Sequence, residues 1–133
     1  EPENYECLKK NMDLTRGQTR MLGLGDCDGW ATLRNPAPTN SGAWTMAESE
    51  SGRNRIFTLD FDGVKFCPDL VKIDVQGMEG AVLRGGAKLL RAAKPVILVE
   101  ANDPVAIKDG LEGWGARMVW SRNRDQIWAW MEE

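Results

Sequence analysis

The chain has 133 residues, the length of one ordinary domain, and its 17 basic and 20 acidic residues give a formal net charge of −3. It therefore lacks the basic surplus of a nucleic-acid or anionic-membrane binder, and no apolar run approaches the roughly 20 residues of a membrane-spanning helix. The sequence contains no histidine, which excludes catalysis and metal binding by histidine side chains. Its three widely spaced cysteines predict free thiols in a reducing cytoplasm rather than disulfides or a metal site.

The first half of the chain predicts one helix and several short strands. Apolar residues at helical spacing indicate a helix over residues 4–12, with Asn4 as its N-cap. Residues 19–24 look extended and lead into an Asp-Cys-Asp-Gly turn. Three further short strands are expected at residues 30–33, 43–46 and 55–59. We therefore expect a small antiparallel excursion near residues 29–59.

The second half of the chain alternates strands and helices. A strand is expected at residues 70–75, then a helix at 78–93 in which the pair Gly85-Gly86 predicts a kink or a late start. The nearly unbroken apolar run at 95–100 is typical of a central parallel strand covered on both faces. One more helix and two closing strands are expected at residues 106–111, 117–120 and 126–130. This order predicts an α/β fold with a mostly parallel sheet and an antiparallel C-terminal edge hairpin.

Acidic residues follow the predicted strands at the place where such folds bind ligands, outside the carboxyl ends of the strands. Asp74 ends the first of these strands, Glu100 ends the second, and Glu79 lies in the first turn of the helix between them. Acids in this arrangement suit a ligand with hydroxyl groups or positive charge. Each could instead be a helix cap or a dipole partner. Asp74 is the strongest candidate because it lies inside an apolar strand, and Glu1 would join the group if a strand preceded it.

Three other patterns have both a functional and a plain interpretation. The glycines within residues 23–29 depart from the GxGxxG spacing, and no helical pattern follows them, so we expect no phosphate loop. The Asp-x-Asp-Gly segments at 26–29 and 60–63 could hold a divalent metal on a nucleotide sugar, but Asp-Gly is the common dipeptide of turns. Trp128 and Trp130 share one face of the last strand and either pack internally or form a platform for a sugar ring.

Residues 69–100 resemble the FkbM family of S-adenosylmethionine-dependent methyltransferases. That family has a strand ending in K-I-D-V-E-G, a glutamate two residues later, V-L-R-G in the next helix and a strand closing in V-E, and this sequence matches in order and spacing. Further matches extend over almost the whole chain, at residues 1–2, 24–26 and 58–60. Gln76 departs from the pattern, because the family usually has glutamate there, and its uncharged side chain argues against an acid–base role at that position.

The resemblance implies an incomplete Rossmann-like methyltransferase fold, in which residues 1–133 form a single N-terminally truncated domain. The first strand, the glycine-rich loop that cradles the methionine end of the cofactor and the first helix have no counterpart in this sequence. The implied cofactor is S-adenosylmethionine. Glu1 would bind its ribose hydroxyls, Gly23 and Leu24 would line its adenine, and Asp74 would lie near the transferring methyl group.

The resemblance also implies which residues carry the chemistry. A hydroxyl acceptor must lose a proton as it attacks the methyl group. Asp74 or Glu79 would take that proton, and Lys72 is the remaining option in a chain without histidine.

We therefore expect an O-methyltransferase that acts on a sugar or glycan hydroxyl in the cytoplasm, without nucleic-acid or membrane partners. One alternative is a non-catalytic methyltransferase fragment that folds by self-association. Another is a sugar-binding or glycosyltransferase-like module that uses the Asp-x-Asp turns. The strand at 70–75 would leave an open sheet edge, so we expect that edge to be covered by re-pairing or by a second copy in a homo-oligomer such as a dimer.

Overall fold

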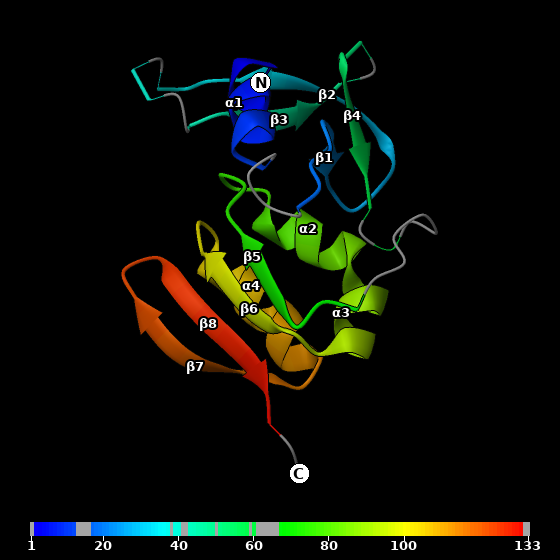
Figure 1. Cartoon of the computed structure of the whole chain (residues 1–133). Coiled ribbons are helices and arrows are strands. Elements are labelled where there is room, and N and C mark those ends of the chain that lie inside the picture. Colours follow the sequence, from blue (N-terminus) through cyan, green and yellow to red (C-terminus); the bar gives the residue numbers. More distant parts are fainter. Residues whose placement is uncertain are drawn as a thin grey trace.

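The computed structural model describes residues 2–12, 17–37, 39–40, 43–49, 51–58, 60 and 67–131. Its elements, in chain order, are α1 (Pro2–Met12), β1 (Gly23–Leu24), β2 (Gly29–Arg34), β3 (Thr45–Glu48), β4 (Asn54–Phe57), β5 (Leu70–Ile73), α2 (Glu79–Gly85), α3 (Ala87–Ala93), β6 (Val96–Glu100), α4 (Pro104–Gly113), β7 (Ala116–Arg122) and β8 (Asp125–Trp130). The strands form two four-stranded sheets (Figure 1). We call them the N-terminal sheet, with order β1-β4-β2-β3, and the C-terminal sheet, with order β5-β6-β8-β7.

The C-terminal sheet holds the main hydrophobic core on one of its faces. Side chains alternate along a strand, so Ile97 and Val99 of β6 point to the same face, where both are fully buried. The register pairs Ile97 with Trp128 of β8, whose ring is also buried there. Helices α2, α3 and α4 cover this face with buried side chains of Val82, Leu83, Leu90, Ile107 and Leu111. Each large apolar side chain buried in this way stabilises the fold by about 1.5–3 kcal/mol.

The opposite face of the C-terminal sheet carries no helix of the described residues, and Figure 1 shows it turned to the viewer with α4 behind it. Leu70 of β5 is 65% exposed on this face, and Val96 of β6 is 40% exposed. The prediction that residues 95–100 form a strand covered on both faces is therefore wrong for one face. Of the two covers expected for the β5 edge, re-pairing is not found within the described residues, where β6 is the strand paired with β5, and cover by a second copy stays a prediction.

The N-terminal sheet confirms the antiparallel excursion near residues 29–59. Strand β2 pairs antiparallel with both β3 and β4, while the short β1 runs parallel to β4. Strand β3 begins two residues later than predicted, and the extended segment at 19–24 contributes a strand only at Gly23–Leu24.

The prediction of a mostly parallel sheet is wrong. Only β1–β4 and β5–β6 are parallel pairs among the described strands, and the other four pairings are antiparallel. The physical reason is that β1 pairs with the excursion strand β4 instead of joining β5, so each sheet keeps a single parallel pair. The antiparallel hairpin at the edge of the C-terminal sheet is confirmed, with β7 outermost and β8 inserted between β6 and β7.

The helices follow the sequence signals in most places. The predicted helix is interrupted at Gly86, which separates α2 from α3, and this confirms the kink predicted at Gly85-Gly86. Helix α4 begins with the side chain of Asp103 accepting a hydrogen bond from the Ala106 amide. The prediction that Asn4 caps α1 is wrong, because the helix already begins at Pro2, a residue favoured in the first turn because it has no amide to satisfy.

The two sheets meet where the turn after β1 lies against α2. A side chain added at Gly85 would collide with the carbonyl oxygen of Gly25, so the approach of the two segments depends on glycine in α2. Arg84, the residue before it, pairs with Asp26 of the same turn. The V-L-R-G and L-G-D segments, far apart in the sequence, therefore form one joint.

Candidate functional site

The carboxyl ends of β5 and β6 lie at one edge of the C-terminal sheet, and the turn between β7 and β8 lies at the same edge (Figure 1). Parallel pairing places Ile73 beside Val99, so Asp74, the residue after β5, lies next to Glu100, the last residue of β6. Glu79 reaches this edge from the first turn of α2. We call Asp74, Glu79 and Glu100 the acid cluster.

Asp74 is held by two donors from its own segment. Lys72 Nζ lies 3.3 Å from Asp74 Oδ2, and Gln76 Nε2 lies 3.1 Å from Asp74 Oδ1. Burial raises the pKa of Asp74, but the hydrogen bonds from Lys72 and Gln76 and the charge of Lys72 outweigh it, so the pKa lies below its ordinary value. Asp74 is therefore charged at neutral pH and is better suited to balance a positive charge than to accept a proton.

Glu79 has no exposed surface, which is unusual for a carboxyl group. Its Oε1 accepts hydrogen bonds from the Gly77 amide at 2.9 Å and from Asn102 Nδ2 at 2.8 Å. Its Oε2 is also buried and has no hydrogen-bond partner among the described residues. Because an unsatisfied buried carboxyl oxygen costs free energy, this atom is typical of a functional site.

Asn102 and Arg124 extend the cluster and were not singled out by the sequence. Arg124 Nη1 donates to Asn102 Oδ1 at 2.8 Å, and Arg124 Nη2 lies 2.6 Å from Glu100 Oε1. Asn102 follows a strand that ends in an acid, which is a weak signal for a site. Arg124 lies in a hairpin turn, where an arginine has no distinctive local pattern.

The comparison with known families decides the class of the protein. A model of the methyltransferase FkbM domain matches residues 1–133. The chain belongs to the FkbM methyltransferase family. No curated protein and no solved structure matches it. The FkbM motif residues fall in two places in this structure. Lys72 and the acid cluster lie toward the carboxyl ends of β5 and β6, while Arg84 and Gly85 form the joint between the sheets.

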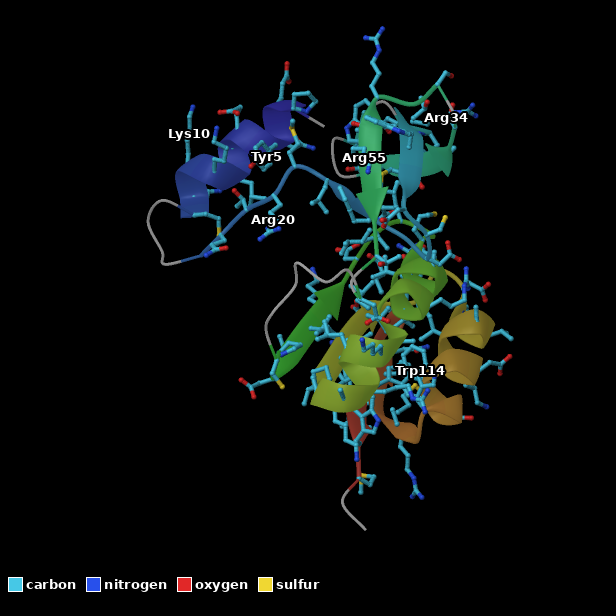
Figure 2. All side chains as sticks on the ribbon, turned by 90° about the vertical axis from the view of Figure 1, so that its right-hand side faces the viewer. Tyr5, Lys10, Arg20, Arg34, Arg55 and Trp114 are labelled. Carbon is cyan, nitrogen blue, oxygen red and sulfur yellow. The ribbon has the colours of Figure 1, made fainter. Side chains whose placement is uncertain are left out.

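The residues expected to line the cofactor's adenine in this FkbM domain lie in β1 of the N-terminal sheet, which also contacts the segment after Asp74, where Thr45 Oγ1 donates to the Gln76 carbonyl oxygen at 3.0 Å. Gly23 is in the N-terminal sheet against the side chain of Met46, and it lines a pocket of about 290 Å³. Tyr5 of α1 and Arg20, both labelled in Figure 2, also line that pocket. Leu24 packs against the core instead, and Glu1 lies outside the described residues.

The fit of the implied cofactor is therefore partial. The acid cluster suits the positive charge of a sulfonium, while Gly23 lines a pocket of the N-terminal sheet. The described residues do not include a group of three or more acidic or thiol side chains arranged to hold a metal ion. None of the described helices is long and apolar enough to cross a membrane.

The Asp-x-Asp segments of this FkbM chain have structural partners. Asp26 pairs with Arg84, and Asp28 Oδ1 accepts a hydrogen bond from the Thr58 amide at 3.3 Å. Asp60 caps α3, accepting from the amides of Lys88 at 2.8 Å and Leu89 at 2.7 Å, while residues 61–63 lie outside the described chain.

The proposed tryptophan platform is also absent from the described strand β8. Trp128 is buried in the core and donates to Gln126 through its ring nitrogen, and Trp130 packs against the same core. The internal packing interpretation of these two rings is therefore the correct one.

Proposed function

We propose that this protein is an S-adenosylmethionine-dependent O-methyltransferase that acts on a sugar or glycan hydroxyl. Membership of the FkbM family indicates methyl transfer. The observation that carries the finer proposal is the acid cluster at the strand ends, with one buried oxygen on Glu79 that has no hydrogen-bond partner among the described residues. Carboxylates accept hydrogen bonds and do not donate them, so this edge favours a ligand rich in hydroxyl groups or carrying positive charge.

Asp74 and Glu79 have different roles in this proposal because their surroundings differ. Asp74, with its lowered pKa, stays charged and balances the positive charge of the donor, while Lys72 holds its carboxylate in place. S-adenosylmethionine, when bound, would supply the methyl group. The acceptor hydroxyl would lose its proton to Oε2 of Glu79, which is enclosed in this structure and has to be uncovered for the acceptor to reach it. Orientation of the reactants and exclusion of water provide most of the acceleration.

The test combines cofactor binding and methyl transfer. Calorimetry of the 133-residue chain with S-adenosylhomocysteine should show micromolar binding. Transfer of a labelled methyl group to a panel of sugars should occur with the wild-type chain and with Glu112→Gln, an exposed control on α4. Transfer should fall at least about a hundredfold in Glu79→Gln. A chain that binds S-adenosylhomocysteine but methylates amines or carboxylates instead of sugars would contradict the proposed acceptor.

A second candidate is a non-catalytic fragment that associates with itself, and the exposed β5 edge favours it. Leu70 lies 65% exposed beside an open strand edge, which is a hazard for association. Sedimentation should then show a dimer or larger species that Leu70→Lys dissociates. Val105→Lys is the matched control, because Val105 is 66% exposed on α4, away from this edge. A monomer at all concentrations would remove this candidate.

The proposed location is the cytoplasm. All three cysteines are described, all are exposed, and none of them forms a disulfide. Exposed thiols persist most readily in a reducing compartment. The sugar-binding alternative based on Asp-x-Asp turns has no comparable support, because Asp26, Asp28 and Asp60 are engaged in structural hydrogen bonds.

A further inference from the structure

A path of polar contacts joins Glu79 to Glu100 through two side chains outside the FkbM motif. Glu79 accepts from Asn102, Asn102 accepts from Arg124, and Arg124 pairs with Glu100. We propose that Asn102 and Arg124 are positioning residues that hold the Glu79 carboxylate so that its Oε2 receives the proton of the acceptor hydroxyl. This inference rests on the proposed function and names two residues that it does not require.

The polarity of the path is fixed by its chemistry. A guanidinium group can only donate hydrogen bonds, so the atom of Asn102 that faces Arg124 at 2.8 Å must be the amide oxygen. The NH₂ group of Asn102 then faces Glu79, which must accept. Glu79 and Arg124 thus fix the orientation of the Asn102 amide from both sides, because one can only accept and the other can only donate.

Glu79 Oε1 therefore accepts two hydrogen bonds. It accepts from the Gly77 amide on one side and from Asn102 on the other. Rotation of the carboxyl group would break both bonds, so the two donors keep Oε2 as the spare atom. Oε2 is closed to solvent in this structure, so an acceptor hydroxyl reaches it only when the segment that covers it moves, and a hydrogen bond formed there is stronger than in water.

Arg124 is itself anchored at two points. Its side chain is paired with Glu100 at 2.6 Å, and its carbonyl oxygen accepts from the Ala101 amide at 2.7 Å. The hairpin turn between β7 and β8 is thereby tied to the end of β6. A purely structural interpretation of the path is that it pins this turn to the sheet.

The two interpretations differ in the variant Arg124→Lys. Lysine keeps the charge but lacks the fork that reaches both Glu100 and Asn102. If the role is positioning, kcat should fall about ten- to a hundredfold while KM changes less than about twofold, because a misplaced base affects the reacting geometry. Asn102→Ala should behave in the same way. Arg122→Lys, an exposed arginine on the same hairpin, is the matched control and should keep both constants.

Nuclear magnetic resonance gives a readout that does not need activity. The side-chain amide protons of Asn102 should exchange slowly with solvent in the wild-type chain, and Arg124→Lys should accelerate that exchange roughly fivefold or more, with no change in Arg122→Lys. Unchanged exchange in Arg124→Lys, or a kcat equal to that of the control, would overturn the inference. If the wild-type chain transfers no methyl group, the proposed function fails, and the exchange measurement alone decides whether Arg124 orients Asn102.

Discussion

Arg84 donates two hydrogen bonds to a single oxygen of Asp26, from Nε at 3.0 Å and from Nη2 at 2.8 Å. The two residues are 58 positions apart in the sequence, and they join the turn after β1 to helix α2. A paired guanidinium and carboxylate at the surface is modest in free energy, but here it accompanies a close backbone contact at Gly85.

The ion pair predicts a pH-dependent contribution to stability. The hydrogen bond and charge of Arg84 hold the pKa of Asp26 below its ordinary value of 3.8. A lowered pKa in the folded state stabilises the fold above 3.8, and this contribution is lost as the pH falls from 3.8 through the lowered value. Asp26→Asn should therefore reduce the free energy of unfolding by about 0.5 kcal/mol at pH 7. Urea denaturation across this range should show the two chains converging in acid, whereas the exposed control Asp109→Asn should show no such convergence.

Gly85→Ala should be strongly destabilising, because the new methyl group would overlap the carbonyl oxygen of Gly25. Forcing the two segments apart should cost about 3 kcal/mol or more of unfolding free energy. Gly110→Ala is the control, since nothing lies within 4 Å of the position that its new methyl group would take in α4. That change should stabilise the helix by about 0.5–1 kcal/mol. Equal effects of the two substitutions in urea would contradict the described contact.

Glu79→Gln should separate stability from activity. Glutamine keeps an oxygen to accept from Gly77 and Asn102, and it removes the buried charge. The variant should be about 1 kcal/mol more stable than the wild type at neutral pH, because an uncharged amide costs less to bury unpaired than a carboxylate. Thermal and urea unfolding measure this, with Glu112→Gln as the surface control. A large loss of stability in Glu79→Gln would indicate that the charge itself holds the fold.

Asp60→Ala should loosen the start of α3. Asp60 accepts from two amides at the first turn of that helix, and loss of such a cap costs about 1 kcal/mol. Hydrogen exchange at Lys88 and Leu89 should accelerate, while the amides of α4, capped by Asp103, should keep their rates. Asp60→Asn should retain only part of the protection, because Lys88 and Leu89 donate to different oxygens of Asp60 and asparagine keeps one of them.

Much of the local structure could be predicted because its signals are local. The break at Gly85-Gly86 follows from helix propensity, and the β7–β8 hairpin follows from two strands separated by a short turn. The arrangement of the strands into two sheets could not be predicted in this way. The pairing of β1 with β4 is a choice between distant partners, and no residue near Gly23 encodes it.

The contacts of the candidate site also differ in whether the local sequence predicts them. Lys72 and Asp74 share a strand face at a spacing of two, so their contact follows from the sequence once the strand is known. Asn102 meets Glu79, and Arg124 meets Asn102, only because three separate segments reach one end of the sheet. Asp60 shows the same limit: its sequence indicates a turn, whereas its carboxylate caps a helix 28 positions away.

The order of the C-terminal sheet also determines when the site can exist during synthesis of the chain. Strand β8 is the last described strand to leave the ribosome, yet it occupies an interior place between β6 and β7. Arg124 immediately precedes it. Until this hairpin has been made and inserted, Asn102 lacks the arginine that holds its amide oxygen, so the path of contacts from Glu79 to Glu100 is incomplete. A nascent chain can therefore complete helix α2 and strand β6 while the Arg124 end of this path is still missing.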